Sequence, residues 1–177
     1  MTFGEIMTPR LVLRPPGEPD FADMLSLWSD ADLLRHIGRP STREEIWARL
    51  LKYVGHWALF GFGYRIIREA ASGRFVGEAG IAYQRRANSL DDPEAGWALV
   101  GWAQGRGFAA EALDAILAQA DGDLDMARTT CLIAPDNLAS IKLAERHGYR
   151  SIGAVDMADS SIERFERLRP SAIVGPD

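Results

Sequence analysis

Cysteine and lysine are almost absent from this chain of 177 residues. The single cysteine, Cys131, cannot form an internal disulfide, which is typical of proteins that work in a reducing compartment. Lysine occurs only as Lys52 and Lys142, and the other basic residues are arginines, a skew to which we attach no catalytic meaning. We therefore expect a cytoplasmic protein.

A net positive charge and long apolar runs are also missing. With 20 basic and 25 acidic residues the formal net charge is -5, which argues against a protein that coats nucleic acid or an anionic membrane. No apolar stretch approaches the roughly 20 residues of a membrane helix, and residues 1–10 lack the apolar run of a signal peptide. We expect neither nucleic acid nor a membrane among its partners.

Metal-ligand spacing is absent as well. The three histidines, His36, His56 and His147, lie far apart, and no cluster of cysteine and histidine exists. The sequence therefore predicts no metal site.

The overall composition is typical of one folded domain. Hydrophobic residues make up 47% of the chain and charged residues 25%, enough for a buried core and a solvated surface. The length also fits a single domain. We expect one domain over residues 1–177, compact from about 8 to 169, with a loose tail over 170–177.

Hydrophobic periodicity predicts an α+β fold. Alternating residues favour strands, and apolar residues spaced three and four apart favour helices. The segment Ser41 to Glu45 resembles a capping signal ahead of the second helix. The expected strands cover 10–14, 62–67, 74–83, 94–100, 127–133, 150–155 and 162–168, and the expected helices 21–28, 46–54, 109–120 and 138–147. This is a mostly antiparallel central sheet of about seven strands flanked by about four helices.

A glycine-rich turn, Gln104 to Ala109, lies between a predicted strand and the clearest amphipathic helix. Glycines let backbone N–H groups approach a ligand closely, and a helix N-terminus adds unpaired donors and a partial positive charge. Arg106 could add a full charge at the rim, unless its side chain is simply solvated. Phosphate is the ligand that this pattern predicts.

Two phosphate-binding motifs fit this turn poorly. A nucleotide P-loop needs a lysine, and none lies nearby. A dinucleotide fingerprint is formally present in Gly105, Gly107 and Ala110, with an acidic residue further on at Asp123 or Asp125. However, that fingerprint normally opens a parallel β-α-β array, whereas here five elements precede it and too few residues follow it. A dinucleotide-binding protein therefore remains a weak alternative.

The string Gln104-x-x-Gly107-x-Ala109 resembles the Q/R-x-x-G-x-G/A signature of the GNAT superfamily of acetyl-CoA-dependent N-acetyltransferases. Further segments are similar to the branch that contains the ribosomal-protein N-terminal acetyltransferases, and the resemblance covers nearly the whole chain. These segments are 8–14 (TPRLVLR), 55–57 (GHW), 107–112 (GFAAEA) and 137–140 (NLAS). The resemblance implies a GNAT-like fold and acetyl-CoA as the acyl donor.

The resemblance also implies which residues contact the donor. In the family the pyrophosphate of coenzyme A lies on the backbone amides of the glycine turn, and the pantetheine arm lies along the preceding strand, which splays from its neighbour. Gly101 stands where many members have proline, a departure that could loosen the turn. The implied cofactor-binding residues are Leu99, Val100, Gln104, Gly105, Arg106, Gly107, Phe108, Ala109, Ala110 and Asn137, the last of which is also well placed as a helix N-cap.

Acyl transfer to an amine needs a base for the proton of the amine and an acid for the departing thiolate. By resemblance, Glu94 stands where several GNAT enzymes carry a catalytic glutamate, although on a solvated strand edge it would have no such role. Glu78 is the second candidate, because a charge among small and apolar neighbours is unusual in a half-buried strand. Many members carry a tyrosine acid in the late helix, where this chain has Ala144, so Ser140 is the candidate acid.

Two classes of function remain open at this point. Cys131 lies in an apolar, β-like run without a nearby histidine, so we expect a core thiol and direct attack of the amine within a ternary complex. The alternative is a non-catalytic module that binds acetyl-CoA, which the missing tyrosine at Ala144 supports.

The acceptor is where the sequence says least. The resemblance implies a protein N-terminal α-amine, similar sequences are associated with small-molecule amines, and the net negative charge favours a cationic acceptor. Acceptor contacts are expected from roughly 33–41 and 155–162. The sequence leaves the oligomeric state open, a homodimer included.

Overall fold

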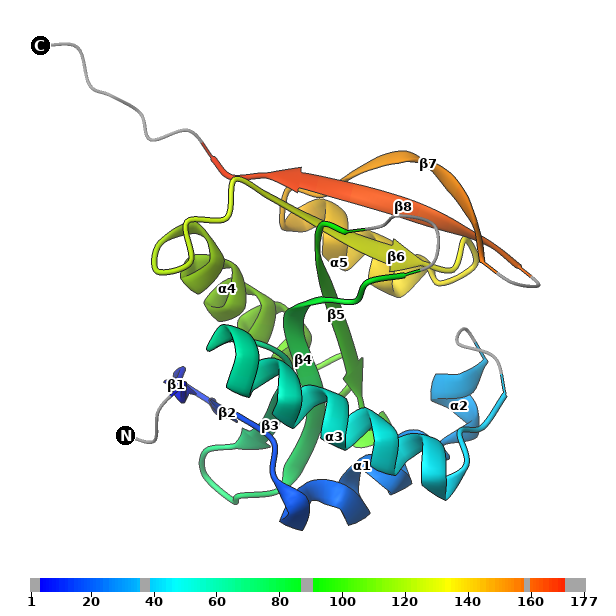
Figure 1. Ribbon diagram of the computed structural model, residues 1–177. Helices are drawn as coiled ribbons and strands as arrows, with labels where there is room; N and C mark the ends of the chain where they lie inside the picture. Colours follow the sequence, from blue (N-terminus) through cyan, green and yellow to red (C-terminus); the bar gives the residue numbers. More distant parts are fainter. Residues whose placement is uncertain (1–3, 36–38, 87–90, 158–159, 171–177) are drawn as a thin grey trace, which may run out of the picture.

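The structure, a computed structural model, describes residues 4–35, 39–86, 91–157 and 160–170. In these residues it contains one eight-stranded sheet, in the order β1-β2-β3-β4-β5-β6-β8-β7, with helices on both faces (Figure 1). The strands are β1 (Ile6–Met7), β2 (Leu11–Arg14), β3 (Arg65–Glu69), β4 (Phe75–Tyr83), β5 (Pro93–Leu99), β6 (Arg128–Ile133), β7 (Arg150–Met157) and β8 (Ser160–Leu168). The helices are α1 (Phe21–Leu27), α2 (Ala31–Leu34), α3 (Arg43–Phe60), α4 (Phe108–Asp121) and α5 (Leu138–Arg146), with short 3₁₀ helices η1 (Glu18–Asp20) and η2 (Gly101–Ala103).

The predicted fold class is confirmed. All seven expected strands and all four expected helices are present, and every pair of neighbouring strands is antiparallel except β5 and β6. The two-residue strand β1 and the one-turn helix α2 were not expected from the sequence. The tail expected over 170–177 lies, from residue 171 on, outside the described residues.

Local signals explain where α3 begins and ends. Thr42 caps the helix, since its hydroxyl accepts from Glu45 N while the Glu45 carboxylate accepts from Thr42 N, so the predicted capping signal is confirmed. Gly61 ends the helix in the left-handed conformation, with φ of 72°. The strand expected at 62–67 therefore begins later, at Arg65, because residues 62–64 first connect the helix to the sheet.

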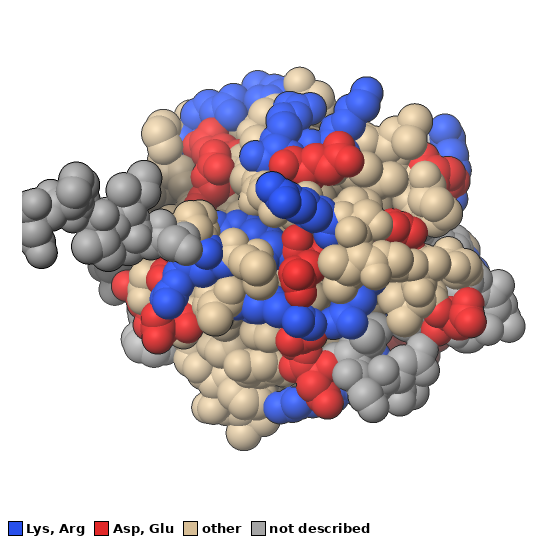
Figure 2. Space-filling model, turned by 90° about the horizontal axis from the view of Figure 1, so that it is seen from above, with Lys and Arg blue, Asp and Glu red and all other residues tan. Residues whose placement is uncertain are grey.

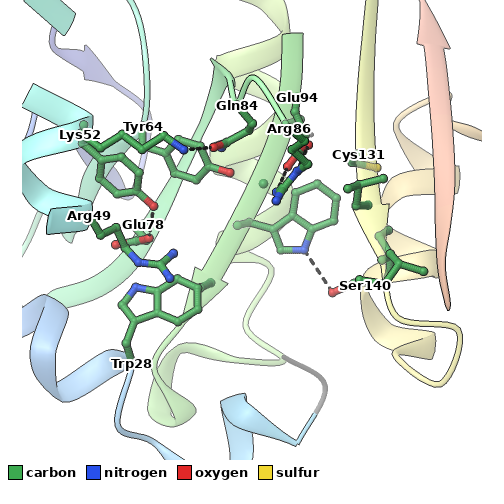
Figure 3. A pocket seen from close by; sticks show the side chains of 18 of the residues that line it. Trp28, Arg49, Lys52, Tyr64, Glu78, Gln84, Arg86, Glu94, Cys131 and Ser140 are labelled. Atoms are coloured by element: carbon green, nitrogen blue, oxygen red, sulfur yellow. Dashed lines mark hydrogen bonds and ion pairs between the residues drawn. The ribbon is translucent and has the colours of Figure 1, made fainter. Parts of the chain in front are cut away.

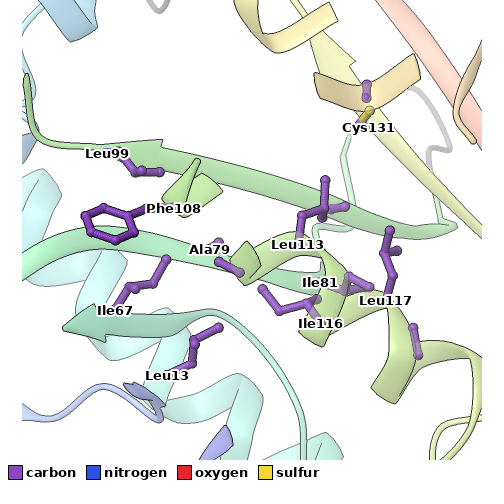
Figure 4. Packing of buried hydrophobic residues seen from close by; sticks show 14 of the residues in the cluster. Leu13, Ile67, Ala79, Ile81, Leu99, Phe108, Leu113, Ile116, Leu117 and Cys131 are labelled. Atoms are coloured by element: carbon purple, nitrogen blue, oxygen red, sulfur yellow. The ribbon is translucent and has the colours of Figure 1, made fainter. Parts of the chain in front are cut away.

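Buried side chains form one hydrophobic cluster on each face of the sheet. The first cluster packs α4 against the sheet and includes Leu113 and Ile116 (Figure 4). The second packs α1 and α3 against the opposite face and includes Met24. Because side chains alternate along a strand, the neighbours Ile66 and Ile67 of β3 belong to different clusters.

The parallel strands β5 and β6 separate almost as soon as they meet. Among the described residues they pair only at Glu94 with Thr130, whereas β5 pairs with β4 from Pro93 to Leu99. Figure 1 shows the two strands diverging. Since no described pair follows Glu94 with Thr130, the backbone groups of β5 beyond Glu94 have no partner in β6. The splay that the resemblance implied is present, and residues of both strands line one cavity there.

The outer surface carries charges of both signs. Seen from the side of β7 and β8, acidic and basic side chains alternate over the surface (Figure 2). Ion pairs explain part of this pattern, since Asp92 accepts from Arg128 Nη2 at 2.6 Å and from Arg164 Nη2 at 2.5 Å. Among the described residues, no helix has both the length and the apolar character needed to cross a bilayer.

Candidate active site

The turn between β5 and α4 presents backbone donors to a ligand. Gly105 and Gly107 have φ angles of 70° and 78°, in the left-handed region that favours glycine. The first hydrogen bond inside α4 runs from Glu111 N to Gly107 O, 3.1 Å, so the amides of residues 108–110 have no partner within the helix. A Cβ added at Gly105 would meet no atom within 4 Å. An anionic group such as a pyrophosphate therefore fits the turn both in charge and in space.

Two side chains hold the turn in place without filling it. Gln104 Nε2 donates to the carbonyl oxygen of Leu99, 3.0 Å. The carboxylate of Glu111 accepts from Thr8 Oγ1 at 2.6 Å and from the backbone N and Nε of Arg10 at 2.8 and 2.6 Å. Since Glu111 is bonded to the β1–β2 region, it does not cover the first-turn amides.

Arg106 stays at the rim of the turn. Its guanidinium lies over the rings of Trp102 and Phe108, 5.3 and 4.9 Å from their centroids, and its side chain is half exposed. The ring of Phe108 is buried in the first cluster. Phe108 can therefore reach a ligand only through its backbone, whereas the guanidinium of Arg106, which lies 3.9 Å from Glu69 Oε1, is exposed at the rim.

The other predicted cofactor residues lie along β5 and at the starts of α4 and α5. Leu99 is buried in the first cluster, and Val100 packs against both clusters. Ala109 and Ala110 are half-buried in the first turn of α4. Asn137 Oδ1 accepts from the amide three residues later at 3.1 Å, which confirms the predicted N-cap of α5.

A cavity of about 570 Å³ opens beside β5, between α3 and the start of α5 (Figure 3). This volume is ordinary for a small-molecule site. The cavity brings together Glu78, Glu94, Ser140 and Asn137, and the glycine turn follows just beyond the stretch of β5 that lines it. Its charged lining residues are Glu45, Arg49, Lys52, Glu78, Arg86 and Glu94.

Glu78 lies on the α3 side of this cavity with one carboxylate oxygen unpartnered (Figure 3). Its side chain is buried, Oε1 accepts from Tyr53 OH at 2.7 Å, and Oε2 has no hydrogen-bond partner in the part of the chain that is described. Burial raises the pKa of the Glu78 carboxyl, and the Tyr53 hydrogen bond and the charge of Arg49 only partly oppose this rise. A carboxylate with a raised pKa accepts a proton more readily than an ordinary glutamate does, which suits a general base.

Glu94 is buried rather than lying on a solvated strand edge, and it is held in an ion pair. Both of its oxygens accept from Arg86, at 2.8 Å from Nε and 2.6 Å from Nη2. A bidentate pair of this kind occupies both carboxylate oxygens and fixes their position. In the β4–β5 register Glu78 pairs with Ala98 and Ala82 with Glu94, so the two glutamates share a sheet face about 14 Å apart along the strands.

Ser140 faces the cavity from α5 (Figure 3). Its Oγ accepts from Trp97 Nε1 at 3.2 Å, a contact that bridges the gap between β5 and α5. Among the described residues no acceptor binds the hydroxyl proton, so it remains available to a ligand. Ala144 is fully buried and offers no polar group.

Cys131 borders the cavity but is poorly suited to be a nucleophile. It is buried in the first cluster, and burial raises the pKa of its thiol far above the ordinary range. The described residues contain no group of three or more His, Cys, Asp or Glu side chains that could hold a metal ion.

The sequence-based prediction missed the α3 side of the cavity. Arg49 and Lys52 line it, whereas the expected acceptor segments, 33–41 and 155–162, contribute only Ile162 among their described residues. A signal was present in the sequence, because two basic residues three apart on an amphipathic helix share one face. That signal does not reveal which residue the two face, however. Only the packing of α3 on β4 brings Arg49 and Lys52 close to Glu78.

Ionisation of Glu78 should cost stability. Because its pKa is raised, the folded protein binds more protons than the unfolded chain between the ordinary glutamate pKa of about 4.3 and the higher folded value, so stability falls as pH rises through that window. Glu78→Gln should therefore melt above the wild type at pH 8 and close to it at pH 4. Each 1 kcal/mol relieved corresponds to about 2 to 4 °C. Equal differences in Tm at both pH values would contradict this explanation.

Comparison with known proteins places the chain among acetyltransferases. Residues 10–150 match the family model of the acetyltransferase (GNAT) domain. A solved structure from Bordetella pertussis, assigned to the GnaT acetyltransferase family, is 34% identical. That match covers 93% of this chain and 99% of the other, with a TM-score of 0.82.

Two more distant solved structures share the fold. The ribosomal-protein-S5-alanine acetyltransferase of Vibrio fischeri is 14% identical over 94% of this chain and 97% of the other, with a TM-score of 0.77. The spermidine N-acetyltransferase of Vibrio cholerae, solved with CoA and spermine, is 17% identical over 92% of this chain and 97% of the other, with a TM-score of 0.72. At these identities the likeness concerns the fold alone.

Proposed function

The chain belongs to the GNAT family of acetyltransferases, and from this premise we propose that it transfers the acetyl group of acetyl-CoA to a primary amine by direct attack within a ternary complex. The observation that carries this proposal is that one cavity is lined by Glu78, on the α3 side, and by Ser140, at the start of α5. A base and a hydrogen-bond donor on opposite sides of one cavity are what amine acylation requires.

The acyl donor is bound by the glycine turn between β5 and α4 and by the space between β5 and β6. When bound, acetyl-CoA supplies an acyl group activated as a thioester. The amides of residues 108–110, with Gly105 and Gly107, bind the pyrophosphate, and Arg106 adds a charge at the rim. The unpaired edge of β5 and Asn137 then hold the pantetheine arm between β5 and α5.

Glu78 is the stronger candidate base of the two glutamates. Its Oε2 has no partner among the described residues and its pKa is raised, so it can take the proton of the attacking amine. Both oxygens of Glu94 accept hydrogen bonds from Arg86, so neither is free to meet the amine. Glu94 then has a positioning role, holding Arg86 against the cavity wall.

Ser140 supplies the donor for the departing sulfur. Trp97 fixes the hydroxyl oxygen from one side, and the hydroxyl proton is left to point toward the ligand. This arrangement replaces the tyrosine that is missing at Ala144, so the missing tyrosine does not by itself favour a non-catalytic binding module.

Direct attack predicts that Cys131 carries no acyl group. Cys131→Ala should keep kcat within a few-fold of the wild type, because the buried thiol with its raised pKa takes no chemical part. Initial-rate plots against acetyl-CoA at several amine concentrations should intersect. Parallel plots together with an inactive Cys131→Ala variant would show a covalent route instead.

The acceptor amine is either a protein N-terminus or a small molecule. The names of the two Vibrio enzymes, which share the fold, concern a ribosomal protein and spermidine, so the fold serves both kinds of acceptor. Thiol release from acetyl-CoA, with mass spectrometry of the products, tests the proposal on a panel of short peptides, polyamines, amino acids and aminoglycosides. Binding of acetyl-CoA without turnover on the whole panel would favour a binding module, and acetylation of hydroxyl compounds alone would contradict the amine assignment.

A further inference from the structure

The charges that line the cavity do not balance. Glu45 is paired outside the cavity lining, since its carboxylate accepts from Arg39 Nη1 at 2.9 Å and Nη2 at 2.5 Å. Glu94 is paired with Arg86 at 2.6 Å. These two acidic residues are therefore neutralised. The charged residues that remain on the cavity wall are Arg49, Lys52 and Glu78.

Arg49 carries a guanidinium that forms no ion pair with a described carboxylate, although its charge lowers the pKa of the nearby Glu78 and Glu45 carboxyls. Its guanidinium carbon lies 3.8 Å from the centroid of the Trp28 ring, so stacking fixes its plane (Figure 3). Its Nε is buried and has no hydrogen-bond partner, and no described carboxylate lies within ion-pair distance of it. A stacked guanidinium keeps its donors at the edge of its plane, in the fork geometry that matches a carboxylate. A guanidinium held in this way at a cavity wall is preorganised to bind an anion.

Lys52 adds to this charge. It lies three residues after Arg49 on the same face of α3, and its Nζ donates to the neutral side chain of Gln84 at 2.5 Å (Figure 3). Even when Glu78 is ionised, one negative charge faces the two cations of α3. The cavity is therefore locally positive, although the whole chain carries a net charge of -5.

We propose that the acceptor is an amino acid, which carries a carboxylate beside its primary amine. This proposal rests on the proposed N-acetyltransferase function and narrows its acceptor. Arg49 binds the carboxylate, Lys52 strengthens the local field, and the amine lies toward Glu78. The net charge of the chain favours cations in the surrounding solution, but the groups that touch the acceptor decide its selection. A polyamine would meet Arg49 with a like charge and leave the guanidinium unpaired.

The test uses pairs of acceptors that differ only by the carboxylate. Thiol release from acetyl-CoA is measured with L-phenylalanine against phenethylamine and with L-ornithine against putrescine. A hydrogen-bonded charged contact corresponds to a factor of about 10 to 100 in kcat/KM. We expect the wild type to favour each amino acid by that factor, and Arg49→Gln to lose the preference through a higher KM. Arg49→Lys should retain part of it.

Arg43 provides a matched control on the same helix. Like Arg49, it lies over an aromatic ring, 4.7 Å from the centroid of Phe21, but it does not line the cavity. Arg43→Gln should keep the wild-type preference for amino acids. A loss of preference in Arg43→Gln equal to that in Arg49→Gln would assign the effect to α3 as a whole and overturn the role of Arg49.

A binding measurement separates failure of this inference from failure of the enzyme function. Calorimetric titration of N-acetyl-phenylalanine and of N-acetyl-phenethylamine, with CoA present, needs no turnover. Tighter binding of the acid by the wild type, lost in Arg49→Gln, supports the carboxylate site even in an inactive preparation. Equal rates for both members of each pair, or equal binding of both products, would show that the carboxylate is not recognised. That result would overturn the amino acid as the acceptor while leaving the proposal of amine acetylation intact.

Peptides distinguish two sources of the carboxylate. Short peptides that begin with aspartate or with alanine are compared with the free amino acids. Faster acetylation of the aspartyl peptide than of any free amino acid would assign the carboxylate to a protein side chain and overturn the free amino acid as the acceptor.

Discussion

Replacement of Glu78 by glutamine should lower kcat by about 10²- to 10⁴-fold, the range that a general base contributes. Glutamine has the same shape and can still accept the hydrogen bond that Tyr53 donates at 2.7 Å, but it cannot take a proton. Rates of thiol release at saturating acetyl-CoA and amine measure the effect. Because burial raises the pKa of Glu78, the wild-type rate should fall at a pH above the ordinary glutamate value of about 4.3 as the solution is acidified. Glu78→Gln should lose this limb of the pH profile.

Glu94→Gln is the matched variant for this prediction. It makes the same change on the same face of the sheet, at a carboxylate that is already occupied by Arg86. We expect kcat within about tenfold of the wild type and an unchanged acid limb. A full rate in Glu78→Gln, combined with a collapse in a folded Glu94→Gln, would exchange the roles of the two glutamates.

Gly107→Val should weaken the binding of acetyl-CoA by about 10- to 100-fold, the equivalent of one lost charge-assisted hydrogen bond of about 1.5 to 3 kcal/mol. Gly107 precedes α4 with φ of 78°, next to the unpaired amides of residues 108–110. A branched side chain there obstructs the approach of the pyrophosphate and strains the left-handed backbone. Isothermal titration calorimetry with CoA measures the loss.

Gly73→Val separates the obstruction from the strain. Gly73 has a similar φ of 70° in the turn between β3 and β4, and a Cβ there would meet no atom within 4 Å. This control should lose stability without losing affinity for CoA. Unchanged affinity in Gly107→Val would remove the turn from the donor site.

The donor side of the site could be predicted from the sequence because its signals are local. Gln104, Gly105 and Gly107 lie within four residues of one another, at a strand-to-helix junction that hydrophobic periodicity alone identifies. The N-cap Asn137 likewise depends on a contact only three residues long. Such features need no knowledge of how distant segments pack.

The acceptor side depends on contacts between distant segments. The hydrogen bond from Trp97 to Ser140 joins residues 43 apart in the sequence, and the one from Tyr53 to Glu78 joins residues 25 apart. Neither contact can be predicted from the local sequence pattern. The pairing of Glu94 with Arg86 cannot be inferred from hydrophobic periodicity either, because it is a contact between two polar side chains. The sequence could therefore suggest both glutamates but could not tell which one is occupied.

Evolution can change the two faces of this sheet at different rates. The cluster beneath α4 stabilises the strands and the helix that carry the donor turn, whereas the cluster beneath α1 and α3 stabilises the helix that carries Arg49 and Lys52. Among the described residues, Val100 alone packs against both clusters. Mutations in α1 and α3 can therefore accumulate and reshape the acceptor cavity while the α4 side keeps its packing. Related enzymes can therefore acquire new acceptors through mutations on the face covered by α1 and α3, while the face covered by α4 continues to support binding of the same acyl donor.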